Sequence, residues 1–295
     1  MNKISKAYIE LHLAVFLFGF AAILGDLIRV SAISMVWWRL IMSIGLFMLF
    51  KQIYSEVKGM SKKHIYILLG IGSIISVHWV CFYGSVKLAN ASVALISFSA
   101  TPFFTALVEP LFRKMPWRRI DFILGICIVV AMGFIFNTLD LSMYFGMLVG
   151  LLAAFLAAVF ISLNKKYIEI ASPTTMLFIE MIGAFLFLTI LLPIVYKTDF
   201  SGFVPKGMDW FFLILMVVFC TMLAFVLHLR SLKHISAFTS NFVISLEPVY
   251  GIFLAIIILK EHRELNTQFY FGVVFMITIV LLYPFIKAKD KNSKL

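Results

Sequence analysis

Charged side chains inside apolar segments are the residues of this sequence best suited to chemistry. Arg39, Glu180 and Glu247 each interrupt a long apolar run. A charge is costly in lipid, so such residues face a protein interior or water and serve ion pairing, binding or proton transfer. Arg39 could bind a substrate carboxylate or form a structural ion pair with Glu180. Glu247 could carry a proton, bind a substrate amine, or act as a structural hydrogen-bonding residue.

Two similar stretches carry further polar residues beside a proline. Residues 87–114 align without gaps with residues 233–260 at an offset of 146, and Pro102 then meets Pro248. Steps of four and seven residues place polar side chains on one helix face. The first face carries Asn90, Ser97 and Thr101, and the second carries Ser236, Ser240 and Glu247. Because proline removes a backbone hydrogen bond, each helix is predicted to loosen at its proline.

An imidazole and an indole could complete a binding site. His78 and Trp79 are adjacent in a third apolar run, where they suit a flat or amphipathic substrate or simply pack against neighbours. We predict a substrate site near the membrane midplane, comprising Arg39, His78, Trp79, Asn90, Ser97, Thr101, Glu180, Ser236, Ser240 and Glu247. The sequence has no motif for a catalytic nucleophile or a nucleotide, and its three cysteines lie in apolar runs. No catalytic residue, cofactor or metal is therefore predicted.

Long apolar segments must position these residues. Hydrophobic residues make up 63% of the chain and charged residues only 13%, which is typical of a polytopic membrane protein. A spanning helix needs about 20 mostly apolar residues. The sequence predicts an all-α protein with ten transmembrane helices at 8–28, 33–50, 65–86, 90–112, 120–137, 143–164, 174–195, 210–229, 234–259 and 267–286. The connections at 51–64 and 196–209 are expected to be loops.

The distribution of positive charge predicts the orientation. With the N-terminus in the cytoplasm, most of the 25 Lys and Arg residues fall in cytoplasmic segments, as expected of a membrane protein. Both termini are therefore predicted to be cytoplasmic, in the plasma membrane. The concentration of Lys and Arg in cytoplasmic segments explains the net charge of +11, and no nucleic-acid partner is expected.

The ten helices divide into two halves of five. Because five is odd, the second half should sit upside down relative to the first, which is the inverted repeat of many secondary transporters. We expect the first repeat at residues 1–140 and the second at residues 141–295. In the second helix of each half Arg39 aligns with Glu180, so the inversion could bring a cation and an anion near one axis.

The chain resembles the EamA-type branch of the drug/metabolite transporter superfamily over nearly its whole length. The resemblance rests on the ten-helix duplication, on Arg39, on the segments TPFFTALVEP and EPVYGIFLAIIILKE, and on Glu261. It implies a transporter of small organic metabolites, often amino acids and frequently moved outward. The first half departs from the pattern, because Met115 stands where Glu261 stands in the second half, and no role is carried over to that loop.

The leading prediction is a secondary transporter that works by alternating access. Its expected partners are a small-molecule substrate, membrane lipid and protons as the coupling ion. A lipid scramblase or a channel is the alternative, although the helices are too apolar for a wide pore. An intramembrane enzyme is a more remote alternative, because the sequence lacks a nucleophile–base set.

Overall fold

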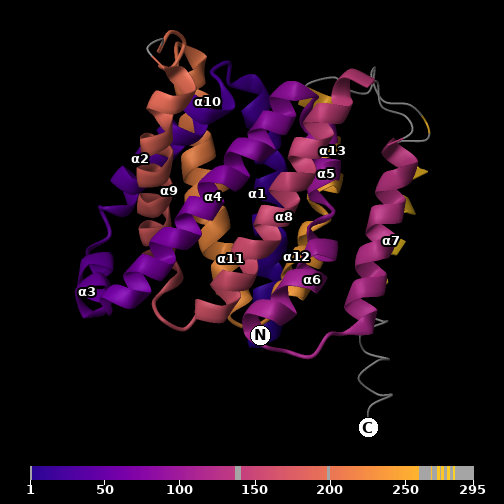
Figure 1. Ribbon diagram of the computed structural model, residues 1–295, viewed down its shortest axis with the longest axis horizontal. Helices are drawn as coiled ribbons and strands as arrows, with labels where there is room; N and C mark the ends of the chain where they lie inside the picture. The colour runs from indigo at the N-terminus through magenta and orange to yellow at the C-terminus, as the bar shows by residue number, and fades with distance from the viewer. Residues whose placement is uncertain are drawn as a thin grey trace.

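The computed structural model describes residues 2–136, 141–197 and 200–258, together with residues 267, 271, 272, 274, 275, 278, 279 and 282. Within these residues the fold is helical and contains no strand (Figure 1). Seven helices are long and apolar enough to cross a membrane, or eight if one bent pair counts as a span. The all-α membrane fold is confirmed at this level. Of the predicted tenth helix, 267–286, the structure describes only residues 267, 271, 272, 274, 275, 278, 279 and 282, which are helical, and the rest lies outside the described residues.

The described helices follow the predicted order. The first half contains α1 (Lys3–Leu27), α2 (Ala32–Phe47), α3 (Lys51–Gly59), α4 (Lys62–Leu88), α5 (Ala91–Phe98), α6 (Thr101–Arg113) and α7 (Arg119–Phe136). The second half contains a short 3-10 turn (Leu141–Met143), α8 (Tyr144–Tyr167), α9 (Pro173–Tyr196), α10 (Met208–Leu215), a π-helix (Met216–Leu223), α11 (Ala224–Leu232), α12 (Ala237–Ile244) and α13 (Glu247–Ile258). Many of these helices begin at a Ser or Asn whose side chain accepts a hydrogen bond from a backbone N–H of the first turn, which is the preferred N-cap arrangement.

Helix α3 corrects the expectation of a loop at 51–64. It turns away from α2 by 93°, and its sequence is mostly polar, with Ile53 as its one buried residue. An amide–carboxylate hydrogen bond of 2.8 Å between Gln52 and Glu56, one turn apart, supports the helix. The apolar residues of α3 do follow helical spacing, but nine mostly polar residues are too short a segment to be recognised as a helix in the sequence.

The two proline-containing spans, predicted as single helices, are each broken into two pieces. The first breaks between Phe98 and Thr101, and the second between Ile244 and Glu247. In each case the proline is the second residue after the break, where its missing N–H costs no helical hydrogen bond. At the offset of 146 the two pairs begin, break and resume at equivalent residues.

These two broken helices cross in opposite directions. Helix α5 packs against α13 and α6 packs against α12, and Figure 1 shows the two contacts at opposite ends of the pair. The Ser245 hydroxyl donates a hydrogen bond to the Ser99 carbonyl at 3.5 Å, and these residues are 146 apart. A contact between equivalent residues requires a local twofold axis to pass between them. The two segments are therefore inverted relative to one another.

Helix α4 crosses the bundle and packs against α8 and α9. The crossing with α9 is so close that a Cβ on Gly72 would lie 1.9 Å from the Glu180 carbonyl oxygen. Only glycine permits such an approach, and small residues of this kind bring membrane helices together. The crossing fixes α4, which carries His78, Trp79 and Tyr83.

Candidate functional site

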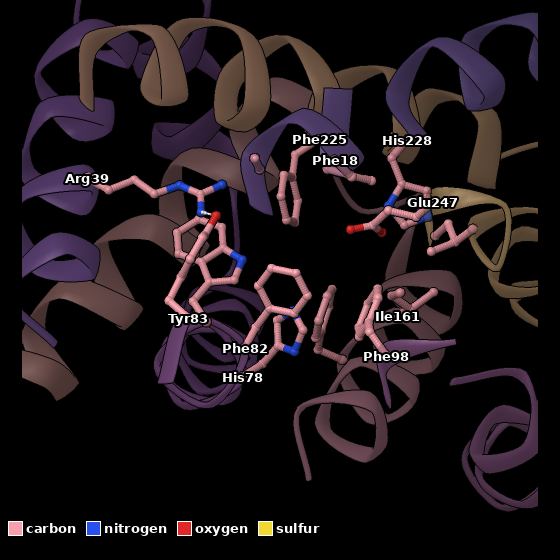
Figure 2. Close-up of a pocket in the computed structure, with 14 residues that line it drawn as sticks. Phe18, Arg39, His78, Phe82, Tyr83, Phe98, Ile161, Phe225, His228 and Glu247 are labelled. Carbon is pink, nitrogen blue, oxygen red and sulfur yellow. Dashed lines mark hydrogen bonds between the residues drawn. The ribbon is translucent and has the colours of Figure 1, made fainter. Parts of the chain in front are cut away.

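A cavity of about 50 Å³ lies in the middle of the bundle, between the two halves (Figure 2). Its lining residues come from both halves and are Phe18, Ala21, Arg39, His78, Trp79, Phe82, Tyr83, Phe98, Phe160, Ile161, Phe225, His228, Ile244 and Glu247. This volume holds a few water molecules and is too small for most metabolites, whose binding pockets are several times larger. The cavity must therefore widen before it can take a substrate.

Arg39 forms one end of the cavity and is only 1% exposed. Its guanidinium donates hydrogen bonds to the Tyr83 hydroxyl at 2.6 Å, the Thr221 hydroxyl at 2.6 Å and the Cys220 carbonyl at 3.2 Å. Its central carbon lies 3.8 Å from the centre of the Trp79 ring, where the π face attracts a cation. Three of the five guanidinium N–H groups are thus used, and the others remain available to a ligand.

The π-helix supplies two of these partners. The Thr221 hydroxyl also donates to the Met216 carbonyl, five residues earlier, at 3.0 Å. π-helical turns are rare and often occur at functional sites. Here the widened turn presents the Cys220 carbonyl and the Thr221 hydroxyl to Arg39 together. An apolar run carries no periodic signal for this feature, because a wider helical turn leaves the run apolar on every side.

The expected direct ion pair between Arg39 and Glu180 is absent. Among the described residues no carboxylate lies within ion-pair distance of Arg39. The Glu180 carboxylate instead accepts a long hydrogen bond, 3.5 Å, from the Asn164 amide, and its other oxygen has no partner in the described chain. Glu180 faces the α8–α9 interface and does not line the cavity, because its place in α9 lies at the close crossing with α4.

Glu247 lies across the cavity from Arg39 (Figure 2). It is the first residue of α13 and is 3% exposed. Within the described part of the chain no hydrogen bond or ion pair is found for its carboxyl group. The first turn of a helix favours a negative charge, and the break before Pro248 places this turn at the cavity wall. The carboxyl group is therefore free to meet a ligand or a proton.

Two histidines line the space between these charged ends. The Nδ1 of His78 lies 2.8 Å from the Ala153 carbonyl, and because a carbonyl only accepts, Nδ1 carries the proton. The Nε2 of His228 lies 2.8 Å from the Ser240 hydroxyl. His228 was not among the residues of the predicted site. A histidine inside an apolar helix was the signal that could have found it.

Aromatic rings form the walls between the charged ends. Phe98 and Phe160 lie with ring centres 5.4 Å and 5.3 Å from that of His78, and Phe18 and Phe225 pack edge to face at 5.0 Å. The cavity thus has a cation at one end, a carboxyl group at the other and an apolar middle. These phenylalanines do not stand out in the sequence, because phenylalanine is common throughout the chain.

The structure brings together only part of the predicted site. Arg39, His78, Trp79 and Glu247 line the cavity, and Ser240 contacts it through His228. Apart from Glu180, the remaining predicted residues make local backbone contacts. Asn90 and Ser236 cap α5 and α12, the Ser97 hydroxyl donates to a carbonyl of its own helix, and the Thr101 hydroxyl donates to the Phe98 carbonyl across the break. The helical spacing of the polar residues identified the correct helices. It did not separate residues that line the cavity from N-caps and buried hydroxyls, because all three occur at the same spacing.

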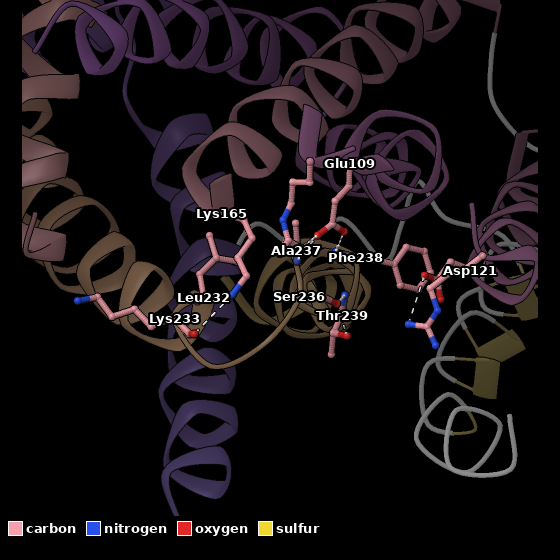
Figure 3. A network of polar contacts seen from close by, with 11 residues as sticks. Glu109, Asp121, Lys165, Leu232, Lys233, Ser236, Ala237, Phe238 and Thr239 are labelled. Carbon is pink, nitrogen blue, oxygen red and sulfur yellow. Dashed lines mark hydrogen bonds and ion pairs between the residues drawn. The ribbon is translucent and has the colours of Figure 1, made fainter. Parts of the chain in front are cut away.

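A polar network closes one end of the bundle below the cavity (Figure 3). The Glu109 carboxylate accepts hydrogen bonds from the backbone N–H groups of Ala237 at 3.2 Å and Phe238 at 2.8 Å. The same carboxylate forms a 2.8 Å ion pair with Arg113. Nearby, the Lys165 ammonium donates to the Leu232 carbonyl at 2.6 Å. Besides pairing with Arg113, Glu109 thus holds the start of α12 against α6.

Comparison with known proteins agrees with this architecture. An uncharacterized transporter of Bacillus subtilis (strain 168), YetK, is 26% identical over 90% of this chain and 83% of its own length. An uncharacterized transporter of Clostridium kluyveri is 28% identical over 65% of this chain and 63% of its own length. A crystal structure with 11% identity shares the fold, with a TM-score of 0.69 over 97% of this chain and 98% of the other. The model of the EamA-like transporter family matches residues 5–137 and again residues 144–284. The chain is a membrane transporter that belongs to the EamA-like transporter family.

Proposed function

We propose that this transporter exports small zwitterionic metabolites of the amino-acid class by alternating access. The observation that carries this proposal is the cavity with Arg39 and Glu247 at opposite ends and aromatic rings between them. A guanidinium binds a carboxylate strongly and in a defined geometry. A carboxylate can likewise bind an ammonium, and the aromatic middle suits an apolar side chain. The outward direction follows the resemblance to the family.

The small volume of the cavity supports alternating access. A site of about 50 Å³ has to open in order to admit a metabolite, and opening at one end at a time would keep the membrane sealed. The Glu109 network holds the end that contains the N-terminus. We propose that this network is broken when the site opens toward the side of the N-terminus, which is cytoplasmic in the predicted orientation.

The proposed frame for this motion is a five-plus-five inverted repeat, with repeats at 1–140 and 141–295. The antiparallel crossing of the broken helices supports it, and the two matches to the family model are compatible with it. A second pair of contacts adds support. Glu56 accepts from the Ser172 N–H at 2.9 Å before α9, and Asp209 accepts from the Arg29 N–H at 3.2 Å before α2. Each acid belongs to one half and holds the start of the second helix of the other half.

Counterflow in proteoliposomes tests the substrate class. Vesicles loaded with a mixture of unlabelled amino acids should accumulate labelled leucine or another labelled amino acid only when the protein is present. Competition by leucine, leucinamide and 4-methylpentanoate then separates the two ends of the molecule. We expect leucine to compete best, because only it carries both the carboxylate and the ammonium.

Two variants connect this preference to the cavity. Arg39→Lys keeps a cation but loses the forked geometry, so it should reduce the preference for leucine over leucinamide. Glu247→Gln should reduce the preference for leucine over 4-methylpentanoate. If both variants lose transport without any change in these preferences, the cavity does not recognise a zwitterion, and the proposed substrate class is wrong.

A further inference from the structure

A second pocket lies at the end of the bundle that carries the N-terminus. It has a volume of about 620 Å³ and opens between the last turns of α6 and α8. Its lining residues are Phe112, Arg113, Lys114, Lys165, Lys166, Ile168 and Glu169. Lys114 adopts a left-handed conformation, with φ of 51°, as the C-cap of α6. This conformation ends the helix and leaves an exposed lysine at the pocket.

The pocket carries an excess of positive charge. Four cationic side chains face one carboxylate, that of Glu169. Arg113 is neutralised by its ion pair with Glu109. Lys114, Lys165 and Lys166 form no ion pair within the described residues. The Lys165 ammonium donates to the carbonyls of Leu232 and Lys233, and it retains one N–H for another acceptor.

An apolar stripe on α8 leads from the membrane core to this pocket. Phe145, Leu148, Leu152 and Phe155 are between 41% and 64% exposed and follow one another at steps of three and four residues, so they share one face. Lys166 lies eighteen residues after Leu148, which is five full helical turns at about 3.6 residues per turn. The lysine therefore caps the same face. Its methylene stem can lie along apolar surface while the ammonium stays at the membrane boundary.

We propose that this pocket binds the phosphate headgroup of an anionic phospholipid, whose acyl chains lie against the apolar stripe of α8. A phosphate would supply the counter-charge that Lys114, Lys165 and Lys166 lack. Basic pockets between membrane helices bind anionic headgroups in this way. A soluble phosphate offers the same charge, but it would make no use of the apolar stripe, which lies about three turns from the lysines on the same helix. The stripe therefore favours the lipid.

The proposed lipid site borders the network that closes this end of the bundle. Arg113 holds Glu109, which caps α12, and Lys165 caps the end of α11. A phosphate that contacts Lys165 through its remaining N–H would add a contact without displacing the existing ones. Binding should therefore raise the thermal stability of the closed arrangement. This inference does not depend on which metabolite is transported.

The test uses the full-length protein purified in detergent, with phosphatidylglycerol or phosphatidylcholine added back. Native mass spectrometry measures retained lipid, and thermal unfolding measures stabilisation. We expect phosphatidylglycerol to be retained and to raise the melting temperature, and phosphatidylcholine to do neither. The double variant Lys114→Gln/Lys166→Gln should weaken retention of phosphatidylglycerol roughly tenfold or more, at about a fivefold loss for each lysine. High salt should weaken it similarly.

Matched variants keep the test specific. Lys62→Gln/Lys63→Gln removes two exposed lysines at the start of α4, outside the pocket, and should leave retention unchanged. Lys114→Arg/Lys166→Arg keeps both charges and should bind like the wild type. An equal loss in the Lys62/Lys63 variant, or equal retention of phosphatidylcholine, would overturn the proposal. Displacement of the lipid by millimolar inorganic phosphate would likewise overturn it in favour of a soluble anion.

Discussion

The two broken helices have the same backbone plan and different chemistry. Each pair begins, breaks and resumes at residues that are 146 apart, and Ser99 meets Ser245 where they cross. After the first break the chain places Thr101, whose hydroxyl donates to the carbonyl of Phe98. After the second break it places Glu247, which faces the cavity. A duplicated scaffold thus supplies two equivalent positions, and only one of them carries a group that can bind a charged ligand.

The N-terminal ends of the two broken helices, at α5 and α12, also share a backbone plan and differ in chemistry. Asn90 caps α5 with its own side chain, accepting from the Val93 N–H at 2.8 Å. Helix α12 has a comparable cap in Ser236 and is held in addition by Glu109 of the other half. The additional carboxylate connects the two halves at one end of the bundle. Both broken helices therefore have the cap and the break that the fold requires. Only the second has the additional carboxylates, Glu109 at its start and Glu247 after its break, that transport could use.

The largest expected effect concerns the residues that follow the two breaks. Glu247→Gln removes the titratable group and nearly preserves its shape, so transport should fall at least about tenfold and lose its dependence on a proton gradient. Thr101→Val removes only a local hydrogen bond, and transport should stay within about twofold of wild type, since the lost bond is worth roughly 1 kcal/mol. Both rates are measured by proteoliposome flux with and without a pH gradient.

A larger loss of transport in Thr101→Val than in Glu247→Gln would refute the unequal roles of these two residues. A Glu247→Gln protein with wild-type rate and wild-type pH dependence would make Glu247 a structural residue, and proton coupling through this carboxyl group would be excluded. A Thr101→Val protein without transport would show that the first break contributes to the substrate site directly. The unfolding temperature of each variant, measured in parallel, separates these outcomes from misfolding.

The next largest effect concerns the helix starts. Glu109→Gln weakens two hydrogen bonds to backbone N–H groups and removes the ion pair with Arg113, which should lower the free energy of unfolding by about 2 kcal/mol. Asn90→Ala removes one cap and should cost about 1 kcal/mol. Thermal or denaturant unfolding in detergent measures both. A Glu109→Gln protein as stable as the wild type would mean that the contact between the halves adds nothing to the stability of α12.

A smaller effect on stability is expected at two further contacts that occupy equivalent positions in the two arms. The Asn241 amide donates to the Thr105 hydroxyl at 2.6 Å, and the equivalent pair in the other arm is Leu95 against Gly251. Asn241→Leu should cost less than about 1 kcal/mol, because the Asn241 carbonyl oxygen already lacks a partner in the described chain and the Thr105 hydroxyl keeps its bond to the Thr101 carbonyl. Thr105→Ala should cost more, since it leaves the whole Asn241 amide unpaired. The reverse order in unfolding experiments would contradict this assignment.

The smallest effect lies outside the spans, at the starts of α2 and α9. Ser31 and Ser172 both cap their helices, but only Ser172 also meets a carboxylate, that of Glu56. Burial has the largest single effect and raises the pKa of Glu56, but hydrogen bonds from Ser172, Thr175 and Gln52 together outweigh it and lower the pKa to about 2. The folded pKa is below the unfolded pKa, so this stabilisation is present above about pH 4.5 and is lost as the pH falls toward 2.

Melting temperatures of the wild type and Glu56→Gln should therefore differ slightly at pH 6, and the difference should shrink at pH 3. The effect is small because the carboxylate is largely exposed. A difference that is independent of pH over this range would show that the charge of Glu56 does not act on the start of α9.

The sequence predicted the spans, the internal similarity and four of the cavity residues for a common reason. The length of an apolar run, the helical spacing of its polar residues and a repeated proline are local properties of the sequence. They can be recognised without knowing how the helices pack. Arg39 and Glu247 stood out because a charge in an apolar run is expensive wherever the run is placed. The break positions followed from Pro102 and Pro248 in the same way.

The missed features depend on packing between distant segments. The π-helix at 216–223 has no periodic signature in an apolar run, and its contact with Arg39 joins residues 181 and 182 positions apart. The Arg39–Glu180 pair was expected from alignment of the repeats, but equivalence under a twofold axis brings residues together only when they lie on the axis. Ser99 and Ser245 meet this condition, and Arg39 and Glu180 do not.

The hydrogen bond between Ser99 and Ser245 has a mechanical consequence. When two bodies rock about an axis, points on the axis move least, and displacement grows with the lever arm. Under the proposed alternating access, this serine pair would lie near the centre of the motion between the two arms, and the Glu109 contact with α12 would lie far from it. The proposed cycle would then keep the weak 3.5 Å contact at the centre, while the shorter contact of Glu109 with the start of α12 is broken and remade.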